Sequence, residues 1–173
     1  MKIFCLSLIA AFATIAVVRA DDASVKLTDV HLCCQSCVKG VQSAISKVKG
    51  VTATADSDEG TISLKGPDVA TVQKGVDALT TAGYFGKSSD PAIKVNADTG
   101  AKGQKVQSLQ IDDVHLCCGK CVKSVTEALS AVSGVQTNTA VKGAKSFTVT
   151  GDFNDKEAFA ALQKAGLTGK VAK

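Results

Sequence analysis

The stretch DVHLCCQSCVKGV at residues 29–41 occurs again, with ten of its thirteen positions unchanged, as DVHLCCGKCVKSV at residues 113–125. Counted between the two histidines, the offset is 115 − 31 = 84 residues. That distance is longer than the period of solenoid repeats and is typical of a duplicated whole domain. The sequence therefore predicts two copies of one small domain, each with three cysteines in the same place.

The residues around the first copy predict a strand, a helix, two strands, a second helix and a short strand. Residues 24–32 are rich in Val, Leu and Thr and predict the first strand. After the cysteines, apolar residues follow the i, i+3, i+4 spacing of an amphipathic helix that ends near Gly50. Two strands are expected at residues 51–55 and 61–65, and a second helix at residues 67–83. A short last strand should follow through Tyr84 and Phe85.

The second copy repeats this order. Strands are expected at residues 108–116, 135–140 and 146–150, with a short last one at residues 167–171. One helix follows the cysteines, and another opens with the capping-box-like pair Asn154 and Glu157. The order β-α-β-β-α-β is that of the ferredoxin-like fold. We therefore expect an α+β chain of two tandem ferredoxin-like domains, each a four-stranded antiparallel sheet with two helices on one face.

The first twenty residues have the features of a signal peptide. Lys2 precedes an apolar run of about sixteen residues, which is short of the ~20 residues that a membrane-spanning helix needs. Small residues before Asp21 favour cleavage near Ala20, and hence a periplasmic or secreted protein with no membrane segment after cleavage. The expected organisation is a signal peptide at 1–20, domains at 21–88 and 106–173, and a linker at 89–105.

The composition argues against nucleic acid as a partner. The formal net charge of +4 falls to +2 when Lys2 and Arg19 leave with the signal peptide. A charge so close to zero does not predict a basic binding face, and a chain with 4% aromatic residues and no Trp lacks stacking platforms for single strands.

The cysteines are the candidate functional residues. Cys5 lies in the signal peptide, and the other six form two groups of three, so neither group can pair fully within itself as disulfides. Two thiols three residues apart can converge on one ion where a helix begins, and the free N–H groups of that helix favour thiolates. Thiolates select soft ions such as Cu(I) and Zn(II). The predicted metal ligands are Cys33, Cys34, Cys37, Cys117, Cys118 and Cys121, with His31 and His115 as further candidates.

Both copies resemble the heavy-metal-associated domain family of copper chaperones, metal-pumping ATPases and periplasmic mercury-binding proteins. The pairs Cys34/Cys37 and Cys118/Cys121 match the family's Cys-x-x-Cys, and the apolar residues and Gly-Val that follow each pair match its helix. The chain departs from the family where His31 and His115 replace a glycine, and where Cys33 and Cys117 add a third thiol. The resemblance implies capture or transfer of a soft metal, Cu(I) before Zn(II), and a partner protein for metal transfer.

Several alternatives stay open at the level of sequence. Each histidine is either a ligand or a polar strand residue that faces solvent, and Cys33, Cys34, Cys37 and His31 would form a Cys₃His set for zinc. The thiols could instead cycle as a redox protein or sensor, or staple an interaction domain as disulfides. The two sites could act separately or hold one ion between them. No catalytic triad or paired carboxylates surround the cysteines, so we expect a protein that is not an enzyme.

Overall fold

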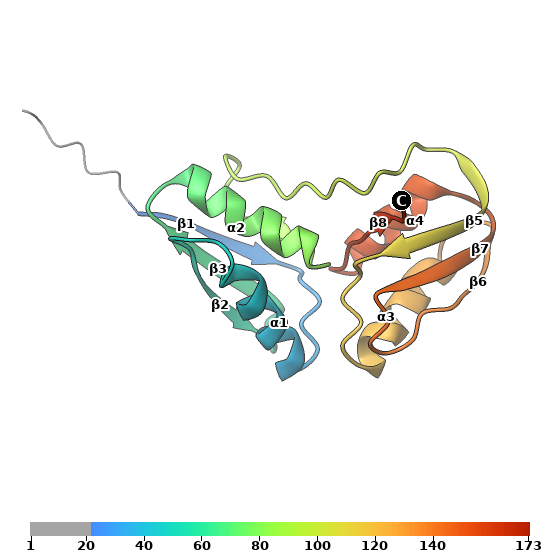
Figure 1. The fold of residues 1–173 in the computed structure, drawn as a ribbon, viewed down its shortest axis with the longest axis horizontal. Helices are drawn as coiled ribbons and strands as arrows, with labels where there is room; N and C mark the ends of the chain where they lie inside the picture. The colour runs from blue at the N-terminus through green and yellow to red at the C-terminus, as the bar shows by residue number, and fades with distance from the viewer. Residues whose placement is uncertain (1–21) are drawn as a thin grey trace, which may run out of the picture.

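The computed structural model describes residues 22–173, so the predicted signal peptide lies outside the described residues. These residues form two four-stranded antiparallel sheets, each with two helices (Figure 1). The two sheets have equivalent strand orders, β2-β3-β1-β4 and β6-β7-β5-β8. This confirms the predicted α+β fold class with two ferredoxin-like domains. Within residues 22–173, no helix has the length and apolar character that crossing a membrane would require.

The element order is the same in both domains. The first domain consists of β1 (Ala23–Thr28), α1 (Gln35–Ile45), β2 (Thr52–Asp56), β3 (Thr61–Gly66), α2 (Val69–Thr81) and β4 (Lys87–Ser88). The second consists of β5 (Lys105–Asp112), α3 (Gly119–Ser130), β6 (Val135–Asn138), β7 (Ser146–Asn154), α4 (Asp155–Lys164) and β8 (Lys170–Val171).

Local sequence explains where the helices begin and which face they bury. The Asp68 carboxylate accepts a hydrogen bond from the Thr71 backbone N–H at the start of α2. Asn154 does the same for α4, where its side chain accepts from the N–H groups of Lys156 and Glu157, as its sequence predicts. The apolar stripes of the helices pack on the sheets, and each fully buried Leu or Ile contributes about 1.5–3 kcal/mol. The largest of these buried aliphatic side chains include Ile62, Leu64, Leu79, Ile111, Leu129 and Leu162.

The predicted last strand of the first domain, at Tyr84 and Phe85, was wrong in its position, whereas that of the second, at residues 167–171, contains the observed β8 but begins too early. The chain turns at Gly83 and Gly166, which have φ angles of 87° and 76°. The next residues, Tyr84 and Leu167, then pair with each other in an isolated antiparallel bridge between the domains. Pairing with the sheets begins only later, at β4 and β8. Tyr84 and Leu167, both expected in the last strands, therefore join the two domains instead.

Further backbone hydrogen bonds surround this bridge. The Gly166 carbonyl accepts from the N–H groups of His31 and Phe85, both at 3.2 Å. The Gly83 carbonyl accepts from the Thr168 N–H at 3.0 Å. The first of these contacts holds the end of α4 against the cysteine loop of the first domain, and a Cβ atom at Gly83 would likewise meet the backbone of Asp113 and His115 in the loop of the second. The two cysteine loops therefore lie side by side at the centre of the molecule (Figure 1).

The segment between β4 and β5 is hydrogen-bonded to both domains. Lys94 exchanges two hydrogen bonds with the Gln73 side chain of α2, at 2.7 and 2.8 Å. At its other end, the segment donates three backbone N–H groups to the Asp155 carboxylate, at 2.7–2.9 Å, from Lys102, Gly103 and Gln104. The predicted linker is therefore anchored at both of its ends.

Candidate metal centre

Each cysteine loop leaves its strand through an aspartate with unusual backbone geometry. Asp29 and Asp113 have φ angles of 59° and 61°, in the left-handed region that few residues other than glycine adopt. Each carboxylate forms an ion pair with the last strand of its own domain, Lys87 at 2.9 Å and Lys170 at 2.8 Å. The equivalence of these two turns places both loops in the same way relative to their helices.

The cysteines lie where each loop becomes a helix. Cys34 and Cys118 are the extended residues that precede α1 and α3, and Cys37 and Cys121 lie in the first turn of those helices. The Cys37 N–H donates to the Cys34 carbonyl at 2.9 Å, which closes the loop around the pair. The free N–H groups of both helix starts therefore point toward the sulfurs and favour negative charge there.

The six sulfurs, which the sequence divides into two groups, lie in one cluster. Across the domain boundary, the Sγ–Sγ distances are 3.3 Å for Cys33–Cys118, 3.5 Å for Cys33–Cys121, 3.5 Å for Cys37–Cys117 and 3.9 Å for Cys34–Cys117. Within the domains they are 3.7 Å for Cys33–Cys37, 3.6 Å for Cys117–Cys121 and 3.8 Å for Cys118–Cys121. All six are free thiols. The contacts across the boundary are as short as those within a domain.

The cluster contains several groups of three ligand atoms that lie within 4.8 Å of one another. Three sulfurs in a plane around one ion, at the metal–thiolate length of about 2.3 Å, are about 4.0 Å apart. The sulfur groups therefore have the size of a three-coordinate soft-metal site. They are Cys33/Cys34/Cys118, Cys34/Cys37/Cys117 and Cys117/Cys118/Cys121, and a fourth group contains His31, Cys33 and Cys121.

The crowded thiols differ in their pKa values. A hydrogen bond from the Cys121 thiol, opposed by burial, lowers the pKa of Cys37 far below its usual range. Burial raises the pKa of Cys118, but the backbone N–H of Cys121 and the Cys33 thiol outweigh it, so the net direction is down. Burial raises the pKa of Cys33 and Cys117, and the Cys37 hydrogen bond raises that of Cys121. Sulfurs this close cannot all become thiolates unless cations compensate their charge.

The two histidines of the repeat have different surroundings. Nε2 of His31 is buried and has no hydrogen-bond partner among the described residues. Nε2 of His115 lies 3.2 Å from the Tyr84 hydroxyl, which donates to the Cys37 carbonyl at 2.8 Å. Because that hydroxyl has only one proton, its oxygen accepts from the His115 N–H. His31 belongs to one of the groups of close ligand atoms, together with Cys33 and Cys121.

Tyr84 is the site residue whose role the sequence did not indicate. Its ring centroid lies 4.6 Å from that of His115 in the other domain, and it is only 1% exposed. The ring lies over Gly40, where a Cβ atom would meet the tyrosine hydroxyl. The signal that could have found it is the unequal pair Tyr84 and Leu167 at matching places of the two copies.

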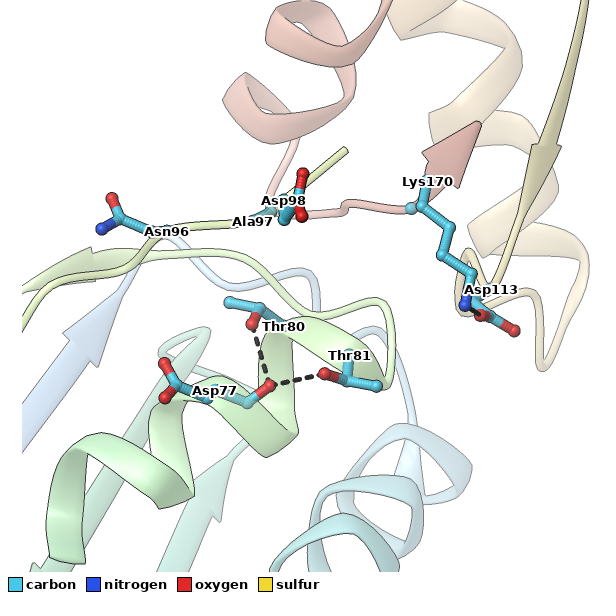
Figure 2. A pocket seen from close by; sticks show the side chains of 9 residues that line it. Asp77, Thr80, Thr81, Asn96, Ala97, Asp98, Asp113 and Lys170 are labelled. Carbon is cyan, nitrogen blue, oxygen red and sulfur yellow. Dashed lines mark hydrogen bonds and ion pairs between the residues drawn. The ribbon is translucent and has the colours of Figure 1, made fainter. Parts of the chain in front are cut away.

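Two hollows lie near the domain boundary. One, of about 390 Å³, is bordered by His115, Leu116 and Cys117 and provides an approach to the sulfur cluster. The other, of about 290 Å³, lies between α2, the linking segment and the start of β8 (Figure 2). It contains the Asp113–Lys170 ion pair, and two threonine hydroxyls at its wall donate to the Asp77 carbonyl. None of the predicted metal ligands lines this second hollow.

One family pattern matches part of the second domain. The pattern of the heavy-metal-associated domain matches residues 109–168. No curated protein matches the chain.

Three solved structures resemble it. A copper binding domain from HMA7, a P-type ATPase, is 21% identical, with a TM-score of 0.36, over 39% of this chain and 96% of that one. The N-terminal soluble domains of Bacillus subtilis CopA are 13% identical, with a TM-score of 0.34, over 88% and 95%. The apo HMA domain of a copper chaperone for superoxide dismutase is 24% identical, with a TM-score of 0.35, over 49% and 85%. At these low identities and TM-scores, none of the three likenesses bears on what this chain binds.

Proposed function

We propose that this chain is a soft-metal-binding protein that holds Cu(I) between two heavy-metal-associated domains, the second of which includes the matched residues 109–168. The observation that carries the proposal is the cluster of six cysteine sulfurs, with contacts of 3.3–3.9 Å across the domain boundary. The conserved order of sheet and helices in residues 22–88 and the repeated CCxxC sequence support a second copy of the same domain. The role is one of binding and not of catalysis.

The ligand geometry favours Cu(I) over Zn(II). The ligand atoms form groups of three, which is a coordination number that Cu(I) accepts, whereas zinc in structural sites takes four ligands in a tetrahedron. The Cys₃His set that the sequence suggested for zinc takes all its ligands from one domain. In the structure, His31 groups instead with Cys33 and with Cys121 of the other domain.

We propose that the protein works outside the cytoplasm after cleavage near Ala20, where it captures or buffers the metal. The hollow beside Cys117 leaves one side of the cluster open, so a partner protein with exposed thiols could exchange ligands there. Metal binding must displace the protons that the crowded thiols share, so it releases acid.

Anaerobic native mass spectrometry of the reduced mature chain tests this function. We expect Cu(I) to remain bound against a competing chelator that removes Zn(II). Replacing Cys34 and Cys118 together by serine should abolish retention of Cu(I), whereas the exposed-site control Ser43→Ala should leave it unchanged. If the reduced chain binds neither ion, the proposal fails. If the untreated protein offers no thiol to alkylation, the disulfide alternative replaces it.

A further inference from the structure

The contacts among the six sulfurs match those expected for the corners of an octahedron. In an octahedron each corner has four neighbours and one opposite corner, which gives twelve edges among fifteen pairs. Seven pairs have Sγ–Sγ distances of 3.3–3.9 Å. Four more lie within 4.8 Å as members of the sulfur groups: Cys33–Cys34, Cys34–Cys37, Cys34–Cys118 and Cys117–Cys118.

The twelfth edge joins the two buried thiols. Cys37 and Cys121 are both completely buried, and both lie 3.5–3.7 Å from the sulfurs of Cys33 and Cys117. The three pairs that remain are Cys33–Cys117, Cys34–Cys121 and Cys37–Cys118. Each sulfur occurs in one of these pairs and only one. This is the pattern of three opposite corners, and a chain or a pair of separate triangles would not produce it.

The three groups of three sulfurs occupy alternate faces of this octahedron. Any two of them share a single corner, which is Cys34, Cys117 or Cys118. The remaining alternate face consists of Cys33, Cys37 and Cys121, with Cys33 at 3.7 Å from Cys37 and 3.5 Å from Cys121. Across these four faces, every sulfur belongs to two, so every thiolate would bridge two ions.

Charge and coordination number both fit four monovalent ions. A planar group of three thiolates suits Cu(I), whereas zinc needs a fourth ligand that a triangular face does not offer. Six thiolates alone carry a charge of −6 in a volume where the sulfurs repel one another. Four Cu(I) ions reduce this to −2, and the helix starts of α1 and α3 face the charge that remains.

We propose that the mature chain binds four Cu(I) ions as one Cu₄S₆ cluster, with one ion on each alternate face of the sulfur octahedron. This inference rests on the proposed function, because it specifies the form in which the copper is held. Three of the four faces combine sulfurs from both domains, and only Cys117/Cys118/Cys121 lies within one. The cluster therefore assembles cooperatively, and neither domain can hold four ions alone.

Two measurements on the reduced mature chain test the cluster. Native mass spectrometry during an anaerobic Cu(I) titration should show the metal-free and four-copper forms together, with few intermediate species. X-ray absorption of the loaded chain should show three sulfur neighbours per copper and short copper–copper scattering. The absorption measurement needs no variant, so it remains valid whatever a substitution does to folding.

Variants separate the cluster from the function on which it rests. Cys33→Ser and Cys117→Ser each remove a corner that bridges two faces but keep both CxxC pairs, so we expect each to lose the four-copper form. Ser36→Ala, at an exposed position beside Cys37, should keep it. A chain that binds two coppers independently, without copper–copper scattering, overturns the cluster and leaves the proposed function standing. A chain that binds no copper overturns both.

Discussion

Tyr84 makes the two histidines of the repeat unequal, because its hydroxyl lies 3.2 Å from Nε2 of His115 and the matching residue of the other copy is Leu167. His115 is consequently held by a protein group, while Nε2 of His31 has no partner among the described residues and lies near the sulfurs of Cys33 and Cys121. Burial, which outweighs the attraction of Cys37, lowers the pKa of His31 and favours the neutral ring. A neutral imidazole can ligate a metal or donate to a thiolate.

Leucine substitutions should separate these two roles. In metal-free protein, we expect His115→Leu to reduce the free energy of unfolding by about 1–2 kcal/mol, because the Tyr84 hydroxyl oxygen loses its donor. His31→Leu removes no hydrogen bond from Nε2, so it should cost less than that. For copper affinity we expect the reverse order of effects. His31→Leu should weaken copper binding by about tenfold or less (within 1.4 kcal/mol), and His115→Leu should change it little.

Urea unfolding and competition with a Cu(I) chelator measure these two quantities. The paired design provides its own control, because each variant serves as the reference for the other. Equal effects of both substitutions on copper affinity would show that the asymmetry of the apo structure has no consequence for the metal.

The sequence named every cysteine of the cluster as a candidate ligand, which stays a prediction, but it did not indicate how the two histidines differ. The ligand residue types and their spacing are local properties, so residues 29–41 and 113–125 indicated a soft-metal site directly. The contact between Tyr84 and His115 depends on how two separate domains dock, which no local pattern contains. For the same reason, the sequence left open whether the two sites act together.

At the scale of elements, two glycine turns join the domains. Gly83 and Gly166 both have positive φ, and a Cβ atom at either one would meet the backbone of the other domain's cysteine loop. Helix ends commonly use glycine in this conformation, so the sequence predicted the two turns correctly. It began both final strands too early, because the residues directly after the turns pair between domains and not with their own sheets, although the second predicted strand contains β8.

Alanine at these turns should therefore weaken domain docking. Gly83→Ala and Gly166→Ala carry the usual cost of a side chain at positive φ, about 1 kcal/mol, and in addition displace the neighbouring domain. Gly143→Ala is the matched control, because its φ is 80° and nothing lies within 4 Å of its Cβ position. Small-angle scattering should show a larger radius of gyration for the first two variants only. Identical scattering from all three would contradict a docking role for these glycines.

The linking segment depends on one carboxylate at the start of α4. Burial raises the pKa of Asp155, but hydrogen bonds from the N–H groups of Lys102, Gly103 and Gln104 outweigh it and lower the pKa below its usual range. A carboxyl group whose pKa is lower in the folded state stabilises the fold at pH values above its unfolded-state pKa, which is about 3.9 for aspartate. That contribution is lost as the pH falls through the folded-state pKa.

We therefore expect the attachment of the linking segment to weaken in acid below about pH 4. Asp155→Asn replaces the two charged acceptor oxygens by one uncharged oxygen, so this part of the acid sensitivity should disappear. At neutral pH the substitution should lower the free energy of unfolding by about 1–3 kcal/mol. Hydrogen exchange of residues 102–104 across a pH series measures the effect locally. Unchanged protection of these amides in the variant would show that the carboxylate does not anchor the segment.

At the scale of the whole molecule, the sulfur cluster lies at the boundary between two domains that each have their own four-stranded sheet. The backbone contacts between them are few, and those around the glycine turns are 3.0–3.2 Å long. The six thiols lie at this boundary, where repulsion between thiolates opposes docking and a bound cation favours it. Metal binding at the cluster, as proposed, would therefore be coupled to domain docking, and each would strengthen the other to the same extent.

This coupling predicts that copper makes the chain unfold as one unit. A ligand that binds only the docked state stabilises it by about 2.7 kcal/mol when free ligand is a hundredfold above its dissociation constant. Since three of the four sulfur faces draw on both domains, that stabilisation must reach both of them. Calorimetry of the reduced, metal-free chain should show two overlapping transitions, and the copper-loaded chain a single one at higher temperature.

Cys33→Ser, which removes a corner of two shared faces, should keep the transitions separate even with copper. If copper shifted only one of the two transitions in the unmodified chain, the metal would belong to one domain alone, and the shared centre would be wrong.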